Sequence, residues 1–214
     1  TRSLIVTGVQ TCALPIYNLD NNMPYITAAL VAFHLLLFMM LWSLIITMNT
    51  HPGEIPLYWG FYIGDEDYKR KRYCLICNAF KPERSHHCSV CNICVLNMDH
   101  HCPWVDNCIG FYNRKYFMQL LFYLCILTHY VNLTEIYEIY TILKMIYKGT
   151  MTYDYIARAA MVLFAYAIIV TLSVLITLFF KFHVGLVLKN STTIESLDKE
   201  HAHEHAKVKL FDLV

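Results

Sequence analysis

Three long hydrophobic runs, separated by polar segments, organise the chain. The first covers residues 25–48 and contains no Asp, Glu, Lys or Arg, the second covers residues 116–134 and the third covers residues 159–180. Each run is close to or longer than the ~20 residues that a helix needs to cross ~30 Å of hydrocarbon. The pattern therefore predicts three transmembrane spans and a largely helical membrane protein.

The basic residues predict how these spans are oriented. Eight Lys and Arg residues lie in the polar segment 49–115 and five Lys residues lie in the tail 181–214, whereas the loop 135–158 contains three basic residues. Loops on the cytosolic side of a membrane carry an excess of Lys and Arg. We therefore expect segment 49–115 and tail 181–214 to be cytosolic and loop 135–158 to be luminal.

The overall composition narrows the class of protein. Hydrophobic residues make up 57% of the chain and charged residues 15%, which is more apolar than a typical soluble domain. The formal net charge of +1 argues against a nucleic-acid partner, because binding phosphates requires a basic surface. A protein embedded in the lipid bilayer is the expected class.

Cysteine and histidine residues gather in the cytosolic segment. Seven of the nine cysteines lie between Cys74 and Cys108, interleaved with four histidines. Thiols and imidazoles at short spacing in a reducing compartment are typical of metal ligands. Two-residue gaps between cysteines let a tight turn bring both sulfurs within about 2.3 Å of one zinc ion. Because a structural zinc site has four ligands, this run has enough ligands for two zinc ions.

The run has more ligand residues than two zinc sites use. Once eight of these residues are committed, His86, His100 and Cys102 remain, and Asp99 lies beside two of them. A carboxylate, an imidazole and a thiol can form a nucleophilic triad, in which the carboxylate orients the imidazole and the imidazole activates the thiol. The alternative is that Cys102 is an idle thiol and His100 a spare ligand. The nearby span favours the triad, because an activated thiol would lie at the bilayer surface, where fatty acyl chains are available.

One continuous string carries a resemblance to a known family. Residues 81–110 read KPERSHHCSVCNICVLNMDHHCPWVDNCIG, which resembles the cysteine-rich domain of DHHC palmitoyltransferases. The likeness continues through Asn113 and Phe117. After the third span, Thr192-Thr193-Ile194-Glu195 resembles the TTxE motif of the same family. Together these features cover most of the chain between residues 25 and 195.

The resemblance implies a fold and a set of site residues. The fold is an all-α polytopic membrane protein of four-helix family architecture, with three spans present here, and a small cytosolic cysteine-rich domain that holds two structural zinc ions. Cys102 would be the acylated nucleophile, His100 the base that takes its proton, Asp99 the residue that fixes the imidazole, and Thr193 a partner of Asp99. The zinc ligands would be Cys74, Cys77, His87 and Cys94 for one ion, and Cys88, Cys91, His101 and Cys108 for the other.

The resemblance also implies an activity. A palmitoyl group would pass from palmitoyl-CoA to Cys102, and from this thioester intermediate to cysteines of other proteins, in a ping-pong reaction. The implied partners are acyl-CoA, substrate proteins with membrane-proximal cysteines and the lipid bilayer, in the endoplasmic reticulum or Golgi. Lys81 and Arg84 of the basic cytosolic segment are candidates to pair with the phosphates of CoA. The alternative for these two residues is a solvated basic face near anionic lipid headgroups.

The chain departs from the family pattern in three places. The family has four spans and an Asp-Pro-Gly motif after the second, whereas this chain has three spans and His51-Pro52-Gly53 in that place. Residues 6–16 resemble a translated sequencing adapter, so we expect residues 1–16 to be an artefact in a truncated reading frame; the alternative is a genuine luminal stretch. Residues 210–213 resemble the start of the family's C-terminal packing motif, which the chain does not complete. We therefore expect a fragment.

Two other classes of function stay open. A non-catalytic zinc adaptor would recruit partners through the same domain, and its binding would survive replacement of Cys102 by Ser, whereas an acyltransferase would lose its activity. A transporter or channel with a cytosolic zinc module is the second alternative. The scarcity of charged residues inside the hydrophobic runs argues against an ion path.

Overall fold

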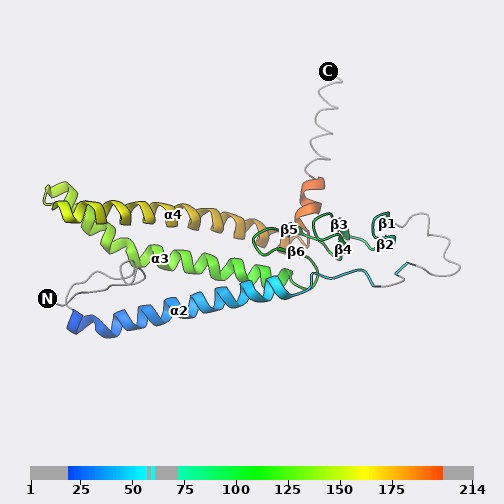
Figure 1. Cartoon of the computed structure of the whole chain (residues 1–214), viewed down its shortest axis with the longest axis horizontal. Coiled ribbons are helices and arrows are strands. Elements are labelled where there is room, and N and C mark those ends of the chain that lie inside the picture. The colour runs from blue at the N-terminus through cyan, green and yellow to red at the C-terminus, as the bar shows by residue number, and fades with distance from the viewer. Residues whose placement is uncertain (1–18, 57–58, 61–71, 200–214) are drawn as a thin grey trace, which may run out of the picture. The chain divides into compact units, whose positions relative to one another are not determined.

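The computed structural model describes residues 19–56, 59–60 and 72–199 (Figure 1). The expected artefact at residues 1–16 and the end of the tail, residues 200–214, lie outside the described residues. The described part divides into two compact units. The helical unit contains residues 19–40 and 121–180, and the cysteine-rich unit contains the remaining described residues up to 120 together with residues 181–199.

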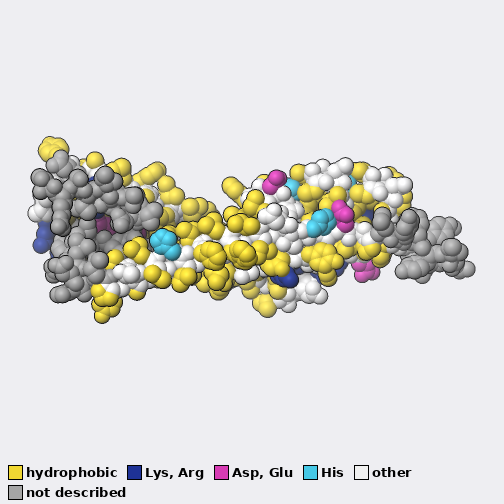
Figure 2. Space-filling view, turned by 60° about the horizontal axis from the view of Figure 1, so that its bottom comes forward, with side chains coloured by type: hydrophobic (Ala, Val, Ile, Leu, Met, Phe, Trp, Pro, Cys, Tyr) yellow, Lys and Arg dark blue, Asp and Glu magenta, His cyan; other side chains and the backbone are white. Residues whose placement is uncertain are grey.

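Three helices dominate the fold: α2 (Leu19–Asn49), α3 (Arg114–Lys148) and α4 (Tyr153–Leu188). Each is long and apolar enough to cross a membrane, and hydrophobic side chains cover much of the described helical surface visible in Figure 2. A helix satisfies its own backbone hydrogen bonds, which a hydrocarbon environment requires. The prediction of a mostly helical protein with three candidate membrane spans is confirmed.

Helix α3 is longer than the hydrophobic run that predicts it. The run ends at residue 134, whereas the helix continues to Lys148, because no Gly or Pro interrupts residues 135–148. The helix stops at Gly149, whose φ of 64° suits a left-handed cap. The amide of Thr150 then donates to the carbonyl of Met145 at 3.2 Å, as in a Schellman motif. Most of the predicted loop 135–158 is therefore helical.

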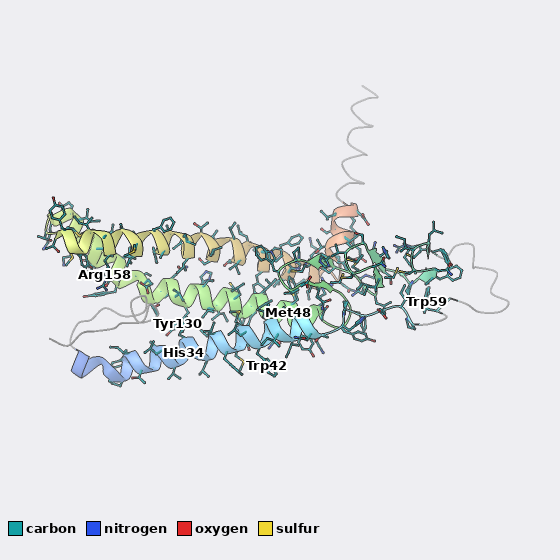
Figure 3. The ribbon with its side chains drawn as sticks, in the orientation of Figure 1. His34, Trp42, Met48, Trp59, Tyr130 and Arg158 are labelled. Carbon is teal, nitrogen blue, oxygen red and sulfur yellow. The ribbon has the colours of Figure 1, made fainter. Side chains whose placement is uncertain are left out.

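In the helical unit, α3 makes polar contacts with both other helices. The hydroxyl of Tyr130 donates to the carbonyl of Ala29 on α2 at 2.8 Å, and Tyr130 lies on the side of α3 that faces α2 (Figure 3). The side-chain amide of Asn132 donates to Ser173 Oγ on α4 at 2.8 Å. Such hydrogen bonds between helices satisfy polar groups that would otherwise face hydrocarbon.

The cysteine-rich unit contains three two-stranded antiparallel hairpins. Its strands are β1 (Arg72–Cys74) with β2 (Ala79–Lys81), β3 (His86–Cys88) with β4 (Ile93–Val95), and β5 (His100–Cys102) with β6 (Asn107–Ile109). Each turn contains one residue with positive φ, namely Asn78 at 51°, Asn92 at 55° and Asp106 at 47°, a conformation that Asn and Asp tolerate better than most residues. These strands qualify the all-α expectation. The sequence did not predict them, because strands of three residues are too short to leave an alternating hydrophobic pattern.

The hairpin β5–β6 is attached to the end of α2. The side-chain amide of Asn107 donates to the carbonyls of Thr47, Met48 and Thr50, at 3.3, 3.1 and 3.0 Å. These carbonyls lie at the C-terminal end of a helix, where carbonyls have no intrahelical partner. Asn107 therefore fixes the hairpin that carries residues 100–102 to the end of the first span.

A small hydrophobic cluster is buried among the hairpins of the cysteine-rich unit. Cys88, Val95, Met98 and Cys108 form one buried cluster. Gly110 follows β6 at a place where two segments approach closely. A Cβ there would lie 2.5 Å from Val95 Cγ1 and 2.7 Å from a backbone oxygen, so a larger residue does not fit without a shift. A cluster of this size supplies little hydrophobic stabilisation, and small domains commonly gain the remainder from cross-links such as metal ions.

Candidate active site and metal centres

The three hairpins repeat one sequence pattern with a period of 14 residues. Cys74, Cys88 and Cys102 each end the first strand of a hairpin and are spaced 14 residues apart. The turn residues with positive φ follow the same spacing, and so do Cys94 and Cys108 in β4 and β6. Self-similarity at a fixed period indicates copies of one structural unit. This signal is present in the sequence but was not among the patterns used to predict the site.

Two groups of four metal-ligating residues form where consecutive hairpins meet. In each group two cysteines come from one hairpin, and a histidine and a cysteine come from the next. The four ligand atoms of each group lie within 4.8 Å of one another. The structure thus brings together both sets that the family resemblance implies. The sets are Cys74, Cys77, His87 and Cys94, and Cys88, Cys91, His101 and Cys108.

The ligand atoms fit a tetrahedral zinc ion. Cys77 Sγ and Cys94 Sγ lie 3.2 and 3.8 Å from His87 Nδ1, and Cys108 Sγ lies 3.6 Å from His101 Nδ1. Ligands at zinc distances of about 2.0–2.3 Å in a tetrahedron are roughly 3.3–3.8 Å apart. Burial, together with neighbouring thiols, raises the pKa of the Cys94 thiol to about 12. A cation is therefore needed to hold such a group of sulfurs as thiolates.

Cys102 belongs to neither group, because the turn of the third hairpin contains no cysteine to act as its partner ligand. Val105 occupies the place that a ligand cysteine holds in each of the first two hairpins. In both groups the later ligands lie 13 and 20 residues after the first cysteine, and the corresponding places after Cys102 are Lys115 and Phe122 of α3. The repeat thus ends where the second span begins. Within the part of the chain that the structure describes, Cys102 is left as a buried thiol outside the Cys/His groups.

Several contacts hold the side chain of Asp99, which hydrogen-bonds to His100. Its carboxylate is fully buried, and Oδ2 lies 2.8 Å from His100 Nδ1 in a hydrogen bond. Thr193 donates to both carboxylate oxygens, from its hydroxyl to Oδ2 at 2.7 Å and from its amide to Oδ1 at 3.0 Å. Arg114 Nη2 lies 3.4 Å from Oδ1. The carboxylate is thereby fixed, and it fixes one nitrogen of the His100 ring in turn.

The TTxE motif positions Thr193 through a capping box. The amide of Thr192 donates to Glu195 Oε2 at 2.9 Å, and the amide of Glu195 lies 3.3 Å from Thr192 Oγ1, to which it donates. This reciprocal pattern starts a helix, and residues 193–199 are helical. The first amides of a helix have no intrahelical acceptor. The amide of Thr193 is one of them and is therefore available to Asp99.

The electrostatics of the site favour transfer of the Cys102 proton to His100. Burial alone would raise the pKa of Asp99, but hydrogen bonds from His100 and Thr193 lower it to about 2. Burial alone would lower the pKa of His100, but its hydrogen bonds to Asp99 and Cys102 raise it to about 9. Burial acts against ionisation of Cys102, yet hydrogen bonds from His100 and from two backbone amides lower the pKa of this thiol overall. A thiol in such surroundings can act as an activated nucleophile.

Sequence comparison identifies the family of this chain. The sequence profile of the DHHC palmitoyltransferase family matches residues 67–200, more than half of the chain. The chain belongs to the DHHC palmitoyltransferase family.

Proteins similar to this DHHC chain occur in plants and animals. Probable protein S-acyltransferase 13 of Arabidopsis thaliana is 38% identical over 205 residues, which cover 87% of this chain and 66% of the relative. Palmitoyltransferase ZDHHC20 of Homo sapiens is 32% identical over 220 residues, which cover 88% of this chain and 58% of the relative. The chain thus spans less than two thirds of the length of these curated relatives.

The candidate active site around Asp99 and His100 contains two residues that sequence reasoning missed. Arg114, treated only as a basic residue before the second span, lies beside Asp99 Oδ1. His183 lies in α4, and its Nδ1 is 3.9 Å from Asp99 Oδ2. No local motif marks His183, because the contact joins residues 84 positions apart in the sequence.

Asp99, His100 and His183 also lie close enough together to form a third group of metal ligands. The donor set argues against a resident ion in this DHHC site. Both oxygens of Asp99 already accept hydrogen bonds from Thr193, and the Arg114 guanidinium at 3.4 Å would repel a metal cation. Asp99 and His100 are instead joined by a hydrogen bond of 2.8 Å.

Arg84 and Lys81 lie in the hairpin region, and Arg84 has a specific partner. Its guanidinium pairs with the carboxylate of Glu195, with Nη2 donating to Oε2 at 2.9 Å, and it donates to the carbonyl of Asn190 at 3.0 Å. Arg84 therefore links the hairpins to the TTxE segment. Lys81 ends β2, opposite Arg72 in the strand pair. The expectation that these two residues bind CoA stays a prediction.

Proposed function

We propose that this chain is a protein S-acyltransferase that takes a palmitoyl group from palmitoyl-CoA and carries it on Cys102. One observation carries the proposal: a buried thiol that belongs to neither four-residue Cys/His group follows the hydrogen-bonded Asp99–His100 pair. Membership of the DHHC palmitoyltransferase family and similarity to proteins named S-acyltransferases support the same activity.

The first half of the reaction transfers the acyl group to the enzyme. His100 takes the proton of Cys102, and the resulting thiolate attacks the thioester carbonyl of palmitoyl-CoA. A new carbon–sulfur bond to Cys102 forms while the carbon–sulfur bond to CoA breaks, and the departing CoA thiolate takes the proton from His100. Asp99, held by Thr193, keeps the imidazole oriented and stabilises its protonated form during this step.

The second half transfers the acyl group to a protein. A cysteine thiol of the substrate gives its proton to His100 and attacks the thioester on Cys102. The bond to Cys102 breaks, and the Cys102 thiolate recovers the proton. Because one thioester replaces another in both halves, the chemical demand is modest, and the protein mainly concentrates, orients and ionises the two thiols.

Zinc has a structural role in this proposal. When bound, the two ions supply cross-links between consecutive hairpins and no reacting atom. The ligand residues hold β5 and β6 together through His101 and Cys108. His100 and Cys102 flank His101 directly in β5, so the ligand histidine fixes the strand that carries the reactive pair.

The location of the site fits a lipid substrate. The hairpin that carries Cys102 is tied by Asn107 of β6 to the end of α2, one of the three described helices able to cross a membrane. An acyl chain lying along these apolar helices would bury methylene groups at about 0.8 kcal/mol each. We propose that the cysteine-rich unit faces the cytosol, that the protein resides in endoplasmic reticulum or Golgi membranes, and that its substrates carry membrane-proximal cysteines.

Lys81 and Arg84 are proposed to contact the phosphates of CoA, and the ion pair of Arg84 makes this testable. Lys81→Gln should raise the palmitoyl-CoA concentration for half-maximal acylation by roughly 5- to 100-fold, as expected for loss of a charge-assisted contact of ~1–3 kcal/mol. Arg84→Gln should in addition lower the maximal rate, because Arg84 also holds Glu195 of the TTxE segment. Kinetics of Cys102 acylation measure both effects. An unchanged half-maximal concentration in both variants would favour contacts with lipid headgroups instead.

A transfer assay tests the proposed function against the zinc adaptor. The purified chain in lipid vesicles is incubated with palmitoyl-CoA and a membrane-anchored acceptor protein with one free cysteine. We expect transfer by the parent chain and by Cys125→Ser, which changes a cysteine of α3 outside both metal groups, and none by Cys102→Ser. Equal transfer by Cys102→Ser and the parent chain would refute the role of Cys102. Binding of the acceptor without transfer, unchanged in Cys102→Ser, would support an adaptor.

A further inference from the structure

His183 lies in the candidate active site, yet the acyl-transfer steps do not use it. It belongs to α4 (Tyr153–Leu188), and its side chain is only 2% exposed. Its Nδ1 lies 3.9 Å from Asp99 Oδ2, the oxygen that also faces His100 Nδ1. Burying a polar imidazole costs free energy unless its nitrogens interact favourably. The position beside a buried carboxylate therefore calls for a role.

Three aromatic rings contact one another beside Asp99. The His100 ring lies 5.2 Å from the ring of Phe117, at an interplanar angle of 70°, and 5.7 Å from the ring of His183, at 44°. Phe117 and His183 are themselves 5.2 Å apart in an edge-to-face arrangement. The His100 ring is thus supported by Phe117 of α3 and by His183 of α4.

The contacts with Phe117 and His183 limit a tilt of the His100 ring that the hydrogen bond to Asp99 allows. The 2.8 Å contact between His100 Nδ1 and Asp99 fixes one atom of the imidazole, but it leaves the ring able to tilt about that atom. A tilt moves the other ring nitrogen, the one available to the thiol of Cys102. Misplacement of a reacting group by 1 Å can reduce a rate by about 100-fold. Contacts on the ring itself are what limit such a tilt.

We propose that His183 is a positioning residue for acyl transfer, whose ring supports the His100 imidazole and whose Nδ1 faces the Asp99 carboxylate. In this role His183 acts through His100 and Asp99 and does not need to touch the acyl donor or the substrate thiol. The inference rests on the proposed function and deepens it. It assigns both a packing contribution, from the ring, and a polar contribution, from the nitrogen at 3.9 Å from Asp99.

Kinetics of the His183→Ala variant provide the first part of the test. The maximal rate of Cys102 acylation by palmitoyl-CoA should fall by ~10- to 100-fold. The palmitoyl-CoA concentration for half-maximal rate should stay within about threefold of the parent value, because His183 contacts His100 and Asp99 and is proposed to act through them. Leu186→Ala is the matched control, since it removes a buried side chain from the same part of α4. It should reduce thermal stability without this selective loss of rate.

Two further variants separate the polar contribution from the packing contribution. His183→Gln keeps a polar group of similar reach, and His183→Phe keeps an aromatic ring without a nitrogen. We expect the Gln variant to recover the acylation rate to within about fivefold of the parent, and the Phe variant to recover thermal stability while its rate stays about tenfold or more below the parent. If instead the Phe variant is as fast as the Gln variant or faster, packing alone explains the residue and the proposal is overturned. The same pair decides the question if His183→Ala does not fold.

A second readout separates failure of this inference from failure of the proposed function. Alkylation of Cys102 by iodoacetamide at one fixed pH, followed by peptide mass spectrometry, reports the reactivity of the thiol without any acyl donor. If the parent chain is not acylated by palmitoyl-CoA, the proposed function fails, yet slower alkylation in His183→Ala and Phe than in Gln would still support the positioning role. If His183→Ala keeps both zinc ions and reacts at the parent rate in both assays, the positioning role is refuted while the proposed function stands.

Discussion

Replacing His100 and His101 by Ala is expected to produce two different failures in adjacent residues. His100→Ala should slow acylation of Cys102 by ~10²- to 10⁴-fold, the loss typical of a missing general base. Its zinc content and its resistance to protease should stay near normal, because the His100 ring hydrogen-bonds to Asp99 and belongs to neither four-ligand group. His86→Ala is the matched control, since His86 lies in β3 and outside both groups. It should change the acylation rate, the zinc content and the protease resistance little.

His101→Ala should fail through the metal. His101 is the histidine of the second group, so its loss removes a ligand and weakens the hairpin that carries Cys102. Structural zinc binding is coupled to folding, so both metal content and protease resistance should fall, and acylation should fall as a consequence. Elemental analysis, limited proteolysis and the rate of autoacylation are measured side by side. If His100→Ala loses zinc while His101→Ala keeps two ions, the ligand assignment is wrong.

Removal of the metal should have an effect as large as loss of the nucleophile. The purified chain should contain two zinc ions, one for each group of four ligands. Structural zinc contributes about 10–16 kcal/mol in small zinc-dependent peptides, far more than the small core around Val95 and Met98 can replace. A strong chelator should therefore open the segment 72–109 to protease and abolish acylation, and added zinc should restore both.

Two variants serve as controls for metal removal. Cys102→Ser should retain both ions, because Cys102 is outside the ligand groups, whereas Cys108→Ser should lose zinc and become sensitive to protease. A content of one ion per chain would contradict the assignment of eight ligands. So would a chelated chain whose cysteine-rich unit stays resistant to protease.

The parts of the fold and site that were predictable from sequence are those set by local spacing. The hydrophobic runs predict α2, α3 and α4, since a long apolar segment is sufficient for a span. The Cys-x-x-Cys spacing and the family resemblance together predict the residues of both metal groups. The end of α3 was missed because residues 135–148 are less apolar, although nothing in them stops a helix before Gly149.

The parts that were missed depend on contacts between distant segments or on a longer repeat. The pairing of Arg84 with Glu195 joins residues 111 positions apart, and the expectation that Arg84 contacts CoA stays a prediction. His183 contributes to the site only because the end of α4 lies beside Asp99, which no local pattern reports. By contrast, the 14-residue repeat and the capping box of Thr192 and Glu195 were present in the sequence. The repeat gives a physical reason why Cys102 is not part of a metal group: Val105 lies where the first two hairpins have a ligand cysteine.

The most direct measurement of the central claim is the mass of the acyl-enzyme. The purified chain is mixed with palmitoyl-CoA in the absence of an acceptor protein, digested, and analysed by mass spectrometry while released CoA is quantified. We predict one palmitoyl group per chain on the peptide that contains Cys102, labile to neutral hydroxylamine as a thioester is, with one CoA released per acyl group and neither product in Cys102→Ser. Acylation of Cys102→Ser equal to that of the parent chain, or a palmitoyl group confined to another cysteine such as Cys125, would contradict the account.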